Sequence, residues 1–312
     1  PSGWLGDVRG PRRVLTRIVL WWSAFTMLTG AAAGFRSLVA IRFLFGAGEA
    51  GAWPCIAQTF SRWIPRKERG TIQGIFFAGA HLSGGVTPLL VVWMLGFMSW
   101  RAIFVVFGLV GFVWAAAWYA WFRNTPAEQG QANPAELAII TAEQEQKTSA
   151  GSGVLVSWMD LLKNSNMWAL CLVYFPNSFA FYFCITWLPT YLKERHNFDA
   201  NQLGFLAGLP LILSVFGDLL GGVVTDRVTA RFGLRAGRCV VGAVAYLIAG
   251  AGLLAVPFCS SSILAAILIA VAVAAVMCTL AASWGTCIDI GGNSAGVVSA
   301  AMNTAGQVGS LL

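Results

Sequence analysis

Long apolar stretches alternate with short charged connections along almost the whole chain. Each stretch holds about 20 residues, the length that an α-helix needs to cross the hydrocarbon core of a bilayer. The expected spans cover residues 14–34, 38–60, 71–95, 102–122, 167–192, 203–225, 239–258 and 263–287, and a further helix begins at residue 295. This pattern predicts an all-α polytopic membrane protein.

One polar segment interrupts the pattern. Residues 123–166 are rich in Pro, Gln, Glu and Gly and contain no apolar run of membrane length, so we interpret them as a linker. The linker separates an N-terminal transmembrane half, residues 1–122, from a C-terminal transmembrane half, residues 167–312.

Composition and charge agree with this class of protein. Hydrophobic residues make up 57% of the chain and charged residues only 11%, compared with about 25% in soluble domains. The net charge is +7, and the Lys and Arg residues gather in connections at residues 6–13, 61–70, 123–166 and 226–238. By the positive-inside rule these connections are predicted to be cytoplasmic. The basic charge therefore indicates a lipid bilayer, and not nucleic acid, as the partner.

The seven cysteines show no CxxC spacing and mostly fall inside apolar runs. We interpret them as small apolar core residues, and we expect neither a disulfide framework nor a metal site. The sequence also lacks an HExxH motif, a cluster of His and Cys ligands, and a nucleophile with its base. We therefore expect no enzyme activity and no cofactor.

Two pairs of segments resemble each other within the chain. The segment GWLGDVRGPRR (Gly3–Arg13) is similar to GVVTDRVTARFGLR (Gly222–Arg235), with Asp7 and Asp226 in corresponding places. Residues 69–85 and 295–309 form a second pair, in which small residues recur at helical spacing. The similar offset of both pairs indicates duplicated halves, as in transporters built from parallel repeats.

The first of these segments resembles the loop signature of the major facilitator superfamily. Within that superfamily, RFLFGAGEAGAWP (Arg42–Pro54), WRAIFVVFG (Trp100–Gly108) and DIGGNSAGVVSAAMN (Asp289–Asn303) are similar to the anion:cation symporter family. Those proteins carry sugar acids, such as hexuronates, glucarate and galactonate, and other organic anions. The resemblance implies two pseudo-symmetric halves of six helices. About ten of the twelve helices would be present in whole or part, and the sequence would be a fragment that lacks helix 1 and helix 12.

Two charged residues fall inside the second expected span. Arg42 and Glu49 are seven residues apart and therefore lie on nearly the same face of one helix, together with Gly46 and Trp53. A charge at mid-membrane costs about 2.5–3.5 kcal/mol on insertion scales, so such residues usually face the interior of the bundle. We predict that this face lines a cavity.

Glu49 is the leading candidate for proton coupling, because desolvation favours the protonated carboxyl. The resemblance supports this, since a glutamate of helix 4 takes part in proton coupling in sugar-acid symporters. Arg42 is predicted to take part nearby or to bind the substrate anion, and a static Arg42–Glu49 pair is the alternative. Asp218 is a second candidate, either as a titrating group or as a gate residue, and a purely structural role is the alternative.

Polar residues inside other spans are predicted to contact the substrate. His81 lies on helix 5, where the resemblance implies substrate contacts, but the polar residues of the sugar-acid pattern are replaced by apolar ones before it. The other candidates are Arg42, Tyr174, Asn177, Tyr182, Asn303 and Gln307. Hydrogen bonds between helices are the alternative role for the amides, and a hydrogen bond to the neighbouring backbone is the alternative role for His81.

Acidic residues at the predicted cytoplasmic ends of helices could form a gate. Asp7 and Asp226 would there interact with a helix N-terminus or a guanidinium and hold the cytoplasmic side shut in one state. The predicted gating residues are Gly3, Asp7, Arg9, Gly10, Arg12, Arg13, Asp226, Arg227 and Arg231. The alternative for the arginines is that they only anchor the topology.

Together these features predict a secondary active transporter that couples proton entry to uptake of an organic anion by alternating access. The substrate would be a sugar acid or a related carboxylate, and the protein a monomer in the plasma membrane. A proton-coupled antiporter that exports drugs or metabolites is the main alternative. A sensor built on the same fold is a more remote one.

Overall fold

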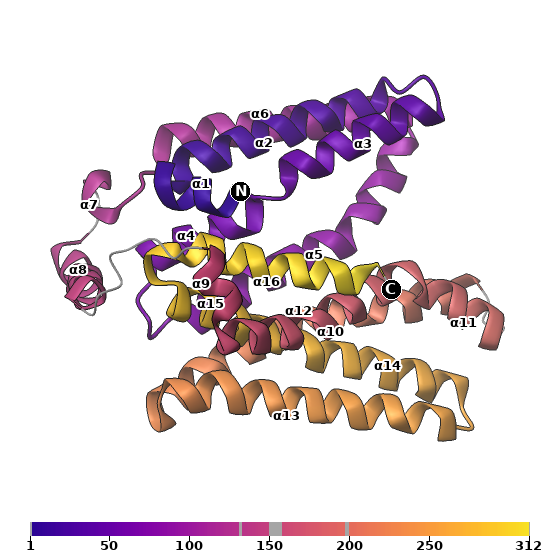
Figure 1. The fold of residues 1–312 in the computed structure, drawn as a ribbon. Coiled ribbons are helices and arrows are strands. Elements are labelled where there is room, and N and C mark those ends of the chain that lie inside the picture. The colour runs from indigo at the N-terminus through magenta and orange to yellow at the C-terminus, as the bar shows by residue number, and fades with distance from the viewer. Residues whose placement is uncertain (1, 131–132, 150–157, 197–199, 312) are drawn as a thin grey trace. The chain divides into compact units, whose positions relative to one another are not determined.

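The computed structural model describes residues 2–130, 133–149, 158–196 and 200–311 (Figure 1). Within these residues every regular element is a helix, as the apolar periodicity predicts. The α-helices are α1 (Ser2–Arg9), α2 (Pro11–Gly30), α3 (Phe35–Glu49), α4 (Ala52–Trp63), α5 (Arg69–Leu95), α6 (Trp100–Trp121), α7 (Pro126–Gln129), α8 (Pro134–Ser149), α9 (Trp158–Lys163), α10 (Ser165–Thr186), α11 (Leu188–His196), α12 (Ala200–Phe232), α13 (Leu234–Ala255), α14 (Ser262–Met277), α15 (Thr279–Gly291) and α16 (Ala295–Ser310). Two short 3-10 helices are η1 (Val256–Phe258) and η2 (Gly292–Ser294).

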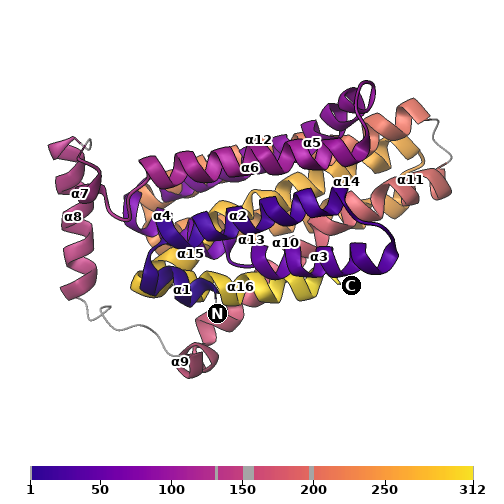
Figure 2. The same ribbon diagram turned by 90° about the horizontal axis from the view of Figure 1, so that it is seen from above.

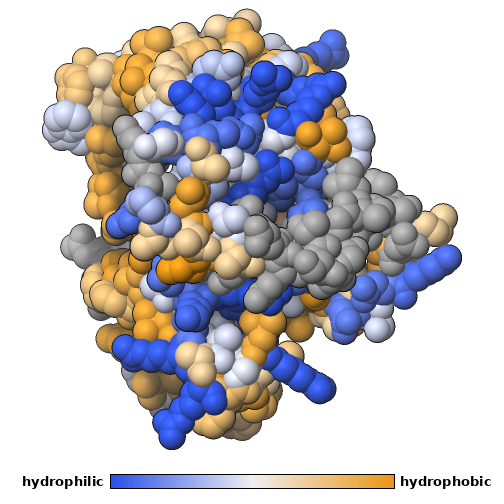
Figure 3. Space-filling view, turned by 90° about the vertical axis from the view of Figure 1, so that its left-hand side faces the viewer, coloured by the Kyte–Doolittle hydropathy of each residue, from blue (hydrophilic) through white to orange (hydrophobic). Residues whose placement is uncertain are grey.

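Six helical segments of the described part are long and apolar enough to cross a membrane. They are Arg69–Leu95, Trp100–Trp121, Ser165–Thr186, Gly204–Phe232, Leu234–Phe258 and the stretch Ser262–Ser310. Their outer surfaces expose large apolar side chains, among them Leu89, Val92 and Leu254. In water such exposure would be costly, so these surfaces fit a lipid environment. Figure 3 shows groups of hydrophilic residues next to apolar ones on the side that it draws.

The expected span 38–60 is not one helix, and this prediction is wrong. α3 ends at Glu49 and α4 begins at Ala52, so Trp53 lies beyond the break and does not share a continuous helical face with Arg42. Gly51 separates the two helices, and Pro54 follows in the first turn of α4. Proline has no N–H to bond the carbonyl of Ala50, and its ring crowds that carbonyl, so the chain breaks here.

The expected span 167–192 is also divided, because α10 ends at Thr186 and α11 begins at Leu188. Pro189 in the first turn of α11 cannot bond the carbonyl of Ile185. The expected span 263–287 is likewise divided between α14 and α15 at Cys278. Proline alone does not cause breaks in this chain, since Pro88 and Pro210 lie inside continuous helices.

The chain forms two compact units, each assembled from separate segments. The first unit comprises Pro1–Pro65, Pro88–Leu161 and Ile288–Ala300, and the second comprises Arg66–Thr87, Leu162–Cys287 and Ala301–Leu312. Each unit therefore contains helices from both predicted transmembrane halves. The boundaries of those halves at residues 122 and 167 stay a prediction.

In the first unit, α2 lies along α6 (Figures 1 and 2). Val14, Leu15, Ile18 and Val19 recur on one face of α2 and are buried together with Ala115 of α6. Close approach is possible because α6 presents glycine at the contact: a Cβ on Gly108 would lie 2.7 Å from the carbonyl oxygen of Ser23. Small residues at helix contacts are typical of membrane bundles.

In the second unit, α12 packs against α13 and α14. Here too glycine allows the contact, since a Cβ on Gly217 would lie 2.4 Å from the carbonyl oxygen of Ala274. Trp284 of α15 is buried and packs between aromatic rings, 5.8 Å from Phe77 and 5.9 Å from Tyr174 between ring centroids. The core of this unit thus includes small residues at helix crossings and an aromatic cluster.

Candidate functional site

Asp7 caps the N-terminus of a distant helix. Its carboxylate accepts hydrogen bonds from the backbone N–H groups of Gly296 and Val297, both at 3.0 Å, in the first turn of α16. These N–H groups have no partner inside their own helix, and the helix dipole also favours a negative charge there. The contact joins α1, from the predicted N-terminal half, to α16, from the predicted C-terminal half.

The Asp7 contact needs glycine on both sides. A Cβ on Gly296 would lie 2.6 Å from Oδ1 of Asp7, and a Cβ on Gly3 would lie 2.2 Å from the carbonyl oxygen of Gly296. Asp7 is only 8% exposed, and its burial raises the pKa of the carboxyl to about 7. The two N–H groups and the nearby Arg62 guanidinium oppose this rise in pKa without cancelling it.

Asp226 makes the corresponding contact in the second unit. Its carboxylate accepts hydrogen bonds from the N–H groups of Gly70, at 2.9 Å, and Thr71, at 2.6 Å, in the first turn of α5. A Cβ on Gly70 would lie 2.5 Å from Oδ1 of Asp226. Each of the two related sequence segments therefore places an aspartate on the N-terminus of a helix from the other half. We expected either a helix N-terminus or a guanidinium as the partner of these aspartates.

The predicted gating arginines have other surroundings. Arg12 donates from Nε and Nη2 to the carbonyl oxygen of Tyr119, at 3.0 and 2.6 Å, and its guanidinium lies 4.4 Å from the Tyr119 ring centroid. These contacts tie α2 to the end of α6, and the roles of Arg12 in gating or in anchoring the topology stay predictions. Gly10 has a φ of +82° and allows the turn between α1 and α2. The exposed arginines of the set are Arg9, Arg13, Arg227 and Arg231.

Arg42 and Glu49 both lie on α3, as the spacing predicts, and Glu49 is its last residue. Arg42 is exposed and lies over aromatic rings, 5.2 Å from the centroid of Phe45 and 5.8 Å from that of Phe104. In the described residues, no ion pair within 4 Å joins Arg42 to Glu49. The two side chains therefore make no direct ion pair in this structure, and a static pair bridged by water stays an alternative.

A cavity of about 420 Å³ adjoins Arg42 in the first unit. Its lining is mainly apolar and contains a second guanidinium. The lining residues are Thr29, Ala32, Ala33, Gly34, Leu38, Arg42, Trp100, Arg101 and Phe104. A cavity with two cations and apolar walls has the chemistry to hold an organic anion.

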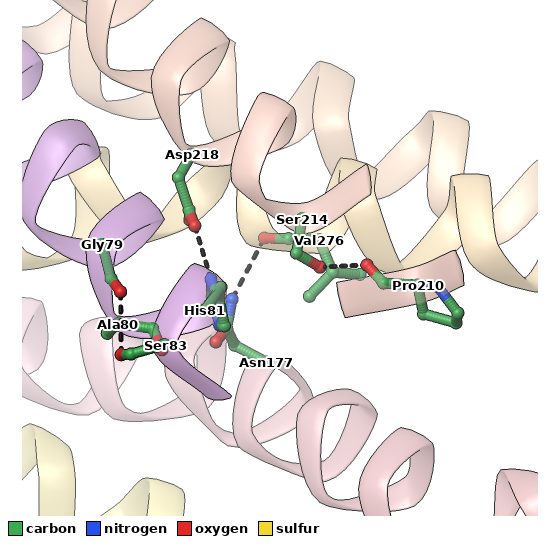
Figure 4. A network of polar contacts seen from close by, with 9 residues as sticks. All are labelled: Gly79, Ala80, His81, Ser83, Asn177, Pro210, Ser214, Asp218 and Val276. Atoms are coloured by element: carbon green, nitrogen blue, oxygen red, sulfur yellow. Dashed lines mark hydrogen bonds and ion pairs between the residues drawn. The ribbon is translucent and has the colours of Figure 1, made fainter. Parts of the chain in front are cut away.

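His81 and Asp218 meet in the second unit (Figure 4). The distance between Nδ1 of His81 and Oδ2 of Asp218 is 2.5 Å, and the two residues are 7% and 1% exposed. We predicted separate roles for them, and 137 positions separate them in the chain. No signal in the sequence indicates this pairing, which depends on the approach of α5 to α12.

Of the amides predicted to contact substrate, Asn177 bonds within the protein. Its Nδ2 donates to the carbonyl oxygen of Val276 and to Oγ1 of Thr279, both at 3.0 Å, where α14 ends. Such bonds fit the alternative role of holding helices together. Tyr174 is buried, Tyr182 and Asn303 are partly buried, and Gln307 is exposed. Their substrate roles stay predictions.

Two buried glutamines were not among the sequence candidates. Gln58 is 2% exposed and accepts a hydrogen bond from Ser61 at 3.3 Å. Gln73 is 1% exposed, and its Nε2 has no hydrogen-bond partner among the described residues. An amide inside an apolar run is the signal that could have identified both residues.

All seven cysteines are free in the structure. Within the described part of the chain, no group of three or more His, Cys, Asp and Glu side chains is placed to hold a metal ion.

Comparison with known proteins decides the family. A family model described as Major Facilitator Superfamily matches residues 1–312. The chain belongs to this superfamily. The predicted family, all-α architecture and membrane location are therefore confirmed, and the family consists of transporters rather than enzymes.

Curated relatives are named for small organic anions. The chain is 35% identical over 307 residues to a probable sulfoacetate transporter of Cupriavidus necator, covering 97% of this chain and 70% of the relative. It is 32% identical over 248 residues to a probable galactarate/D-glucarate transporter of Escherichia coli, covering 74% of this chain and 55% of the relative. For a probable L-galactonate transporter of the same species, the match spans about half of the relative's length.

Solved structures agree on the fold. The proton:xylose symporter XylE bound to a bromodeoxyglucose aligns with a TM-score of 0.74 at 16% identity, covering 99% of this chain and 74% of that chain. A bacterial homologue of the iron transporter ferroportin in an outward-facing state aligns with a TM-score of 0.63 at 12% identity. At this identity the similarity concerns the fold alone.

Proposed function

We propose that the protein is a secondary active transporter that takes up a small organic anion together with protons. The observation that carries this proposal is the Arg42 guanidinium beside a cavity, on the same helix as the Glu49 carboxyl. A guanidinium matches a carboxylate or sulfonate, and a carboxyl in the membrane can exchange a proton. Sulfoacetate, galactarate, D-glucarate and L-galactonate are candidate substrates, because relatives are named for them.

Alternating access would use the two aspartate contacts. Asp7 and Asp226 each join a helix of one predicted half to the N-terminus of a helix from the other half. Movement of the halves apart at this end has to break both contacts, so together they hold the cytoplasmic side closed. In this proposal the loops 6–13, 61–70, 123–166 and 226–238 lie in the cytoplasm.

Transport by the full-length protein in proteoliposomes tests the proposal. With a pH gradient that is acidic outside, wild-type protein should accumulate one of the four anions. Glu49→Gln should lose this accumulation but keep exchange of labelled for unlabelled anion, because exchange does not require release of the proton. Glu68→Gln, on the exposed loop before α5, is the matched control and should accumulate anion like wild type.

Two results would contradict the proposal. Normal accumulation by Glu49→Gln would remove its role in coupling. Anion efflux driven by proton entry, in place of uptake, would support the antiporter.

A further inference from the structure

A buried imidazole and a buried carboxyl form a contact between the predicted halves of the transporter. His81 belongs to α5, in the N-terminal half, and Asp218 belongs to α12, in the C-terminal half (Figure 4). The 2.5 Å contact between them lies inside one compact unit. Along the same two helices, Asp226 bonds the N-terminus of α5, so this helix pair carries two polar contacts.

Among the described residues, no other ion pair involves His81 or Asp218. Phe181 of α10 is the aromatic neighbour of His81, with ring centroids 5.3 Å apart, and Cys278 interacts electrostatically with Asp218. α14 has no ionisable side chain. Arg69, Asp226, Arg227 and Arg231 are the remaining charged residues of α5 and α12. The other packed helices carry Cys171, Tyr174, Tyr182 and Cys184 on α10, Tyr191, Lys193, Glu194, Arg195 and His196 on α11, Arg235, Arg238, Cys239 and Tyr246 on α13, and Cys287 and Asp289 on α15.

The pair must therefore balance its own charge. A neutral imidazole beside a carboxylate leaves one uncompensated negative charge in a buried site, which is costly. One added proton makes the pair neutral overall, as imidazolium with carboxylate or as imidazole with carboxylic acid. Oδ1 of Asp218 is buried and has no hydrogen-bond partner among the described residues, so one oxygen of the carboxyl is unused by the contact.

We propose that His81 and Asp218 form a site that binds one proton together with one anionic group of the substrate. This inference rests on the proposed function and adds a second site for the anion and the proton to the groups Arg42 and Glu49. The proton forms an O–H bond on the Asp218 carboxylate, and the imidazolium of His81 then pairs with the substrate's carboxylate or sulfonate. The site has no net charge before the proton and the anion bind, as imidazolium with carboxylate. It has none after they bind, as imidazolium, carboxylic acid and substrate anion. The proton and the anion therefore each make binding of the other favourable.

Two substitutions distinguish this site from a structural ion pair. In the proposed site, His81→Gln removes the cation and should weaken binding of sulfoacetate or D-glucarate by about tenfold or more, as for a lost charged hydrogen bond. Asp218→Asn should bind the same anion as tightly as wild type or more tightly, because an amide does not compete for the imidazolium. A structural pair would instead be damaged alike by both substitutions.

The measurement is calorimetric titration of each of the four candidate anions into the purified full-length protein at neutral pH, with melting temperatures to verify folding. His196→Gln changes the other histidine of the chain and should bind like wild type. Equal weakening in His81→Gln and Asp218→Asn, or wild-type affinity in His81→Gln, would overturn the inference. If His81→Gln does not fold, tenfold weaker binding by Asp218→Asn alone would overturn it. Absence of binding to wild type for all four candidate anions would overturn the proposed function as well.

Discussion

At the scale of single residues, the chain places carboxylates where backbone N–H groups lack partners. Asp7 and Asp226 each accept two such N–H groups, and glycine at the contact leaves room for the carboxylate. Burial and these hydrogen bonds act in opposite directions on an aspartate, because burial disfavours the charge and the N–H groups favour it. For Asp7 burial prevails, and the pKa rises to about 7.

This shift in pKa predicts a pH dependence of stability. The folded state binds the Asp7 proton more tightly than the unfolded chain, whose carboxyl has the ordinary pKa of 3.8. The stabilisation by this proton is full below pH 4 and is lost as the pH rises through about 7. One pKa unit corresponds to about 1.4 kcal/mol, so the melting temperature of wild type relative to Asp7→Asn should fall by several degrees between pH 5 and pH 8.

Melting curves of the full-length protein in detergent, recorded across this pH range for both variants, provide the measurement. A difference between wild type and Asp7→Asn that stays constant with pH would show that Asp7 keeps an ordinary pKa in the folded protein.

At the scale of elements, the contact of α5 with α12 positions both Asp226 and the His81–Asp218 pair. The helices approach through glycine, since a Cβ on Gly74 would lie 2.4 Å from the carbonyl oxygen of Asp218. A Cβ on Gly222 would lie 2.6 Å from the carbonyl oxygen of Gly70. The spacing between these two helices thus controls the geometry of two polar contacts at once.

Gly222→Ala should separate α5 from α12 and weaken both contacts. Overpacking of this kind typically costs about 1–3 kcal/mol, so the melting temperature and the transport rate should both fall. Gly208→Ala is the matched control on the same helix, because a Cβ there meets no atom within 4 Å. It should leave both quantities unchanged or raise the melting temperature slightly, because alanine favours helix over glycine. Equal melting temperatures and transport rates of Gly222→Ala and Gly208→Ala would contradict a close contact of α5 with α12 at Gly222.

At the scale of the whole molecule, the distribution of charge predicts the orientation in the membrane. Basic residues gather at the helix ends that meet at Gly10 and at Gly233, and in the connection between α4 and α5. The connection between α13 and α14, by contrast, contains neither Lys nor Arg. The positive-inside rule places the first group in the cytoplasm and the last connection outside.

Accessibility of single cysteines tests this orientation. In a variant without the seven native cysteines, Lys67→Cys should react with an impermeant maleimide only after the cells are permeabilised. Ser260→Cys, an exposed residue between α13 and α14, should react in intact cells. The opposite labelling pattern would reverse the predicted orientation and place the aspartate contacts on the outer side.

The sequence predicted the class of fold well, because each span must satisfy its backbone hydrogen bonds internally and so carries its own apolar signal. The sequence predicted less well whether each span forms one continuous helix, as the break between Glu49 and Ala52 shows. Glycine and proline occur both inside helices and at breaks in this chain. Whether a helix continues or breaks at a glycine or proline depends on the packing around that residue, and this packing cannot be seen in the sequence.

What the sequence by itself determined is local: the helices, the membrane environment, the family motif, and the presence of Arg42, Glu49 and the aspartates in unusual places. Tertiary structure alone decided which of these residues meet. Asp7 contacts Gly296 and His81 contacts Asp218 only because distant helices approach through glycine. A hydrogen bond requires atoms within about 3 Å, and distance along the chain carries no information about that separation.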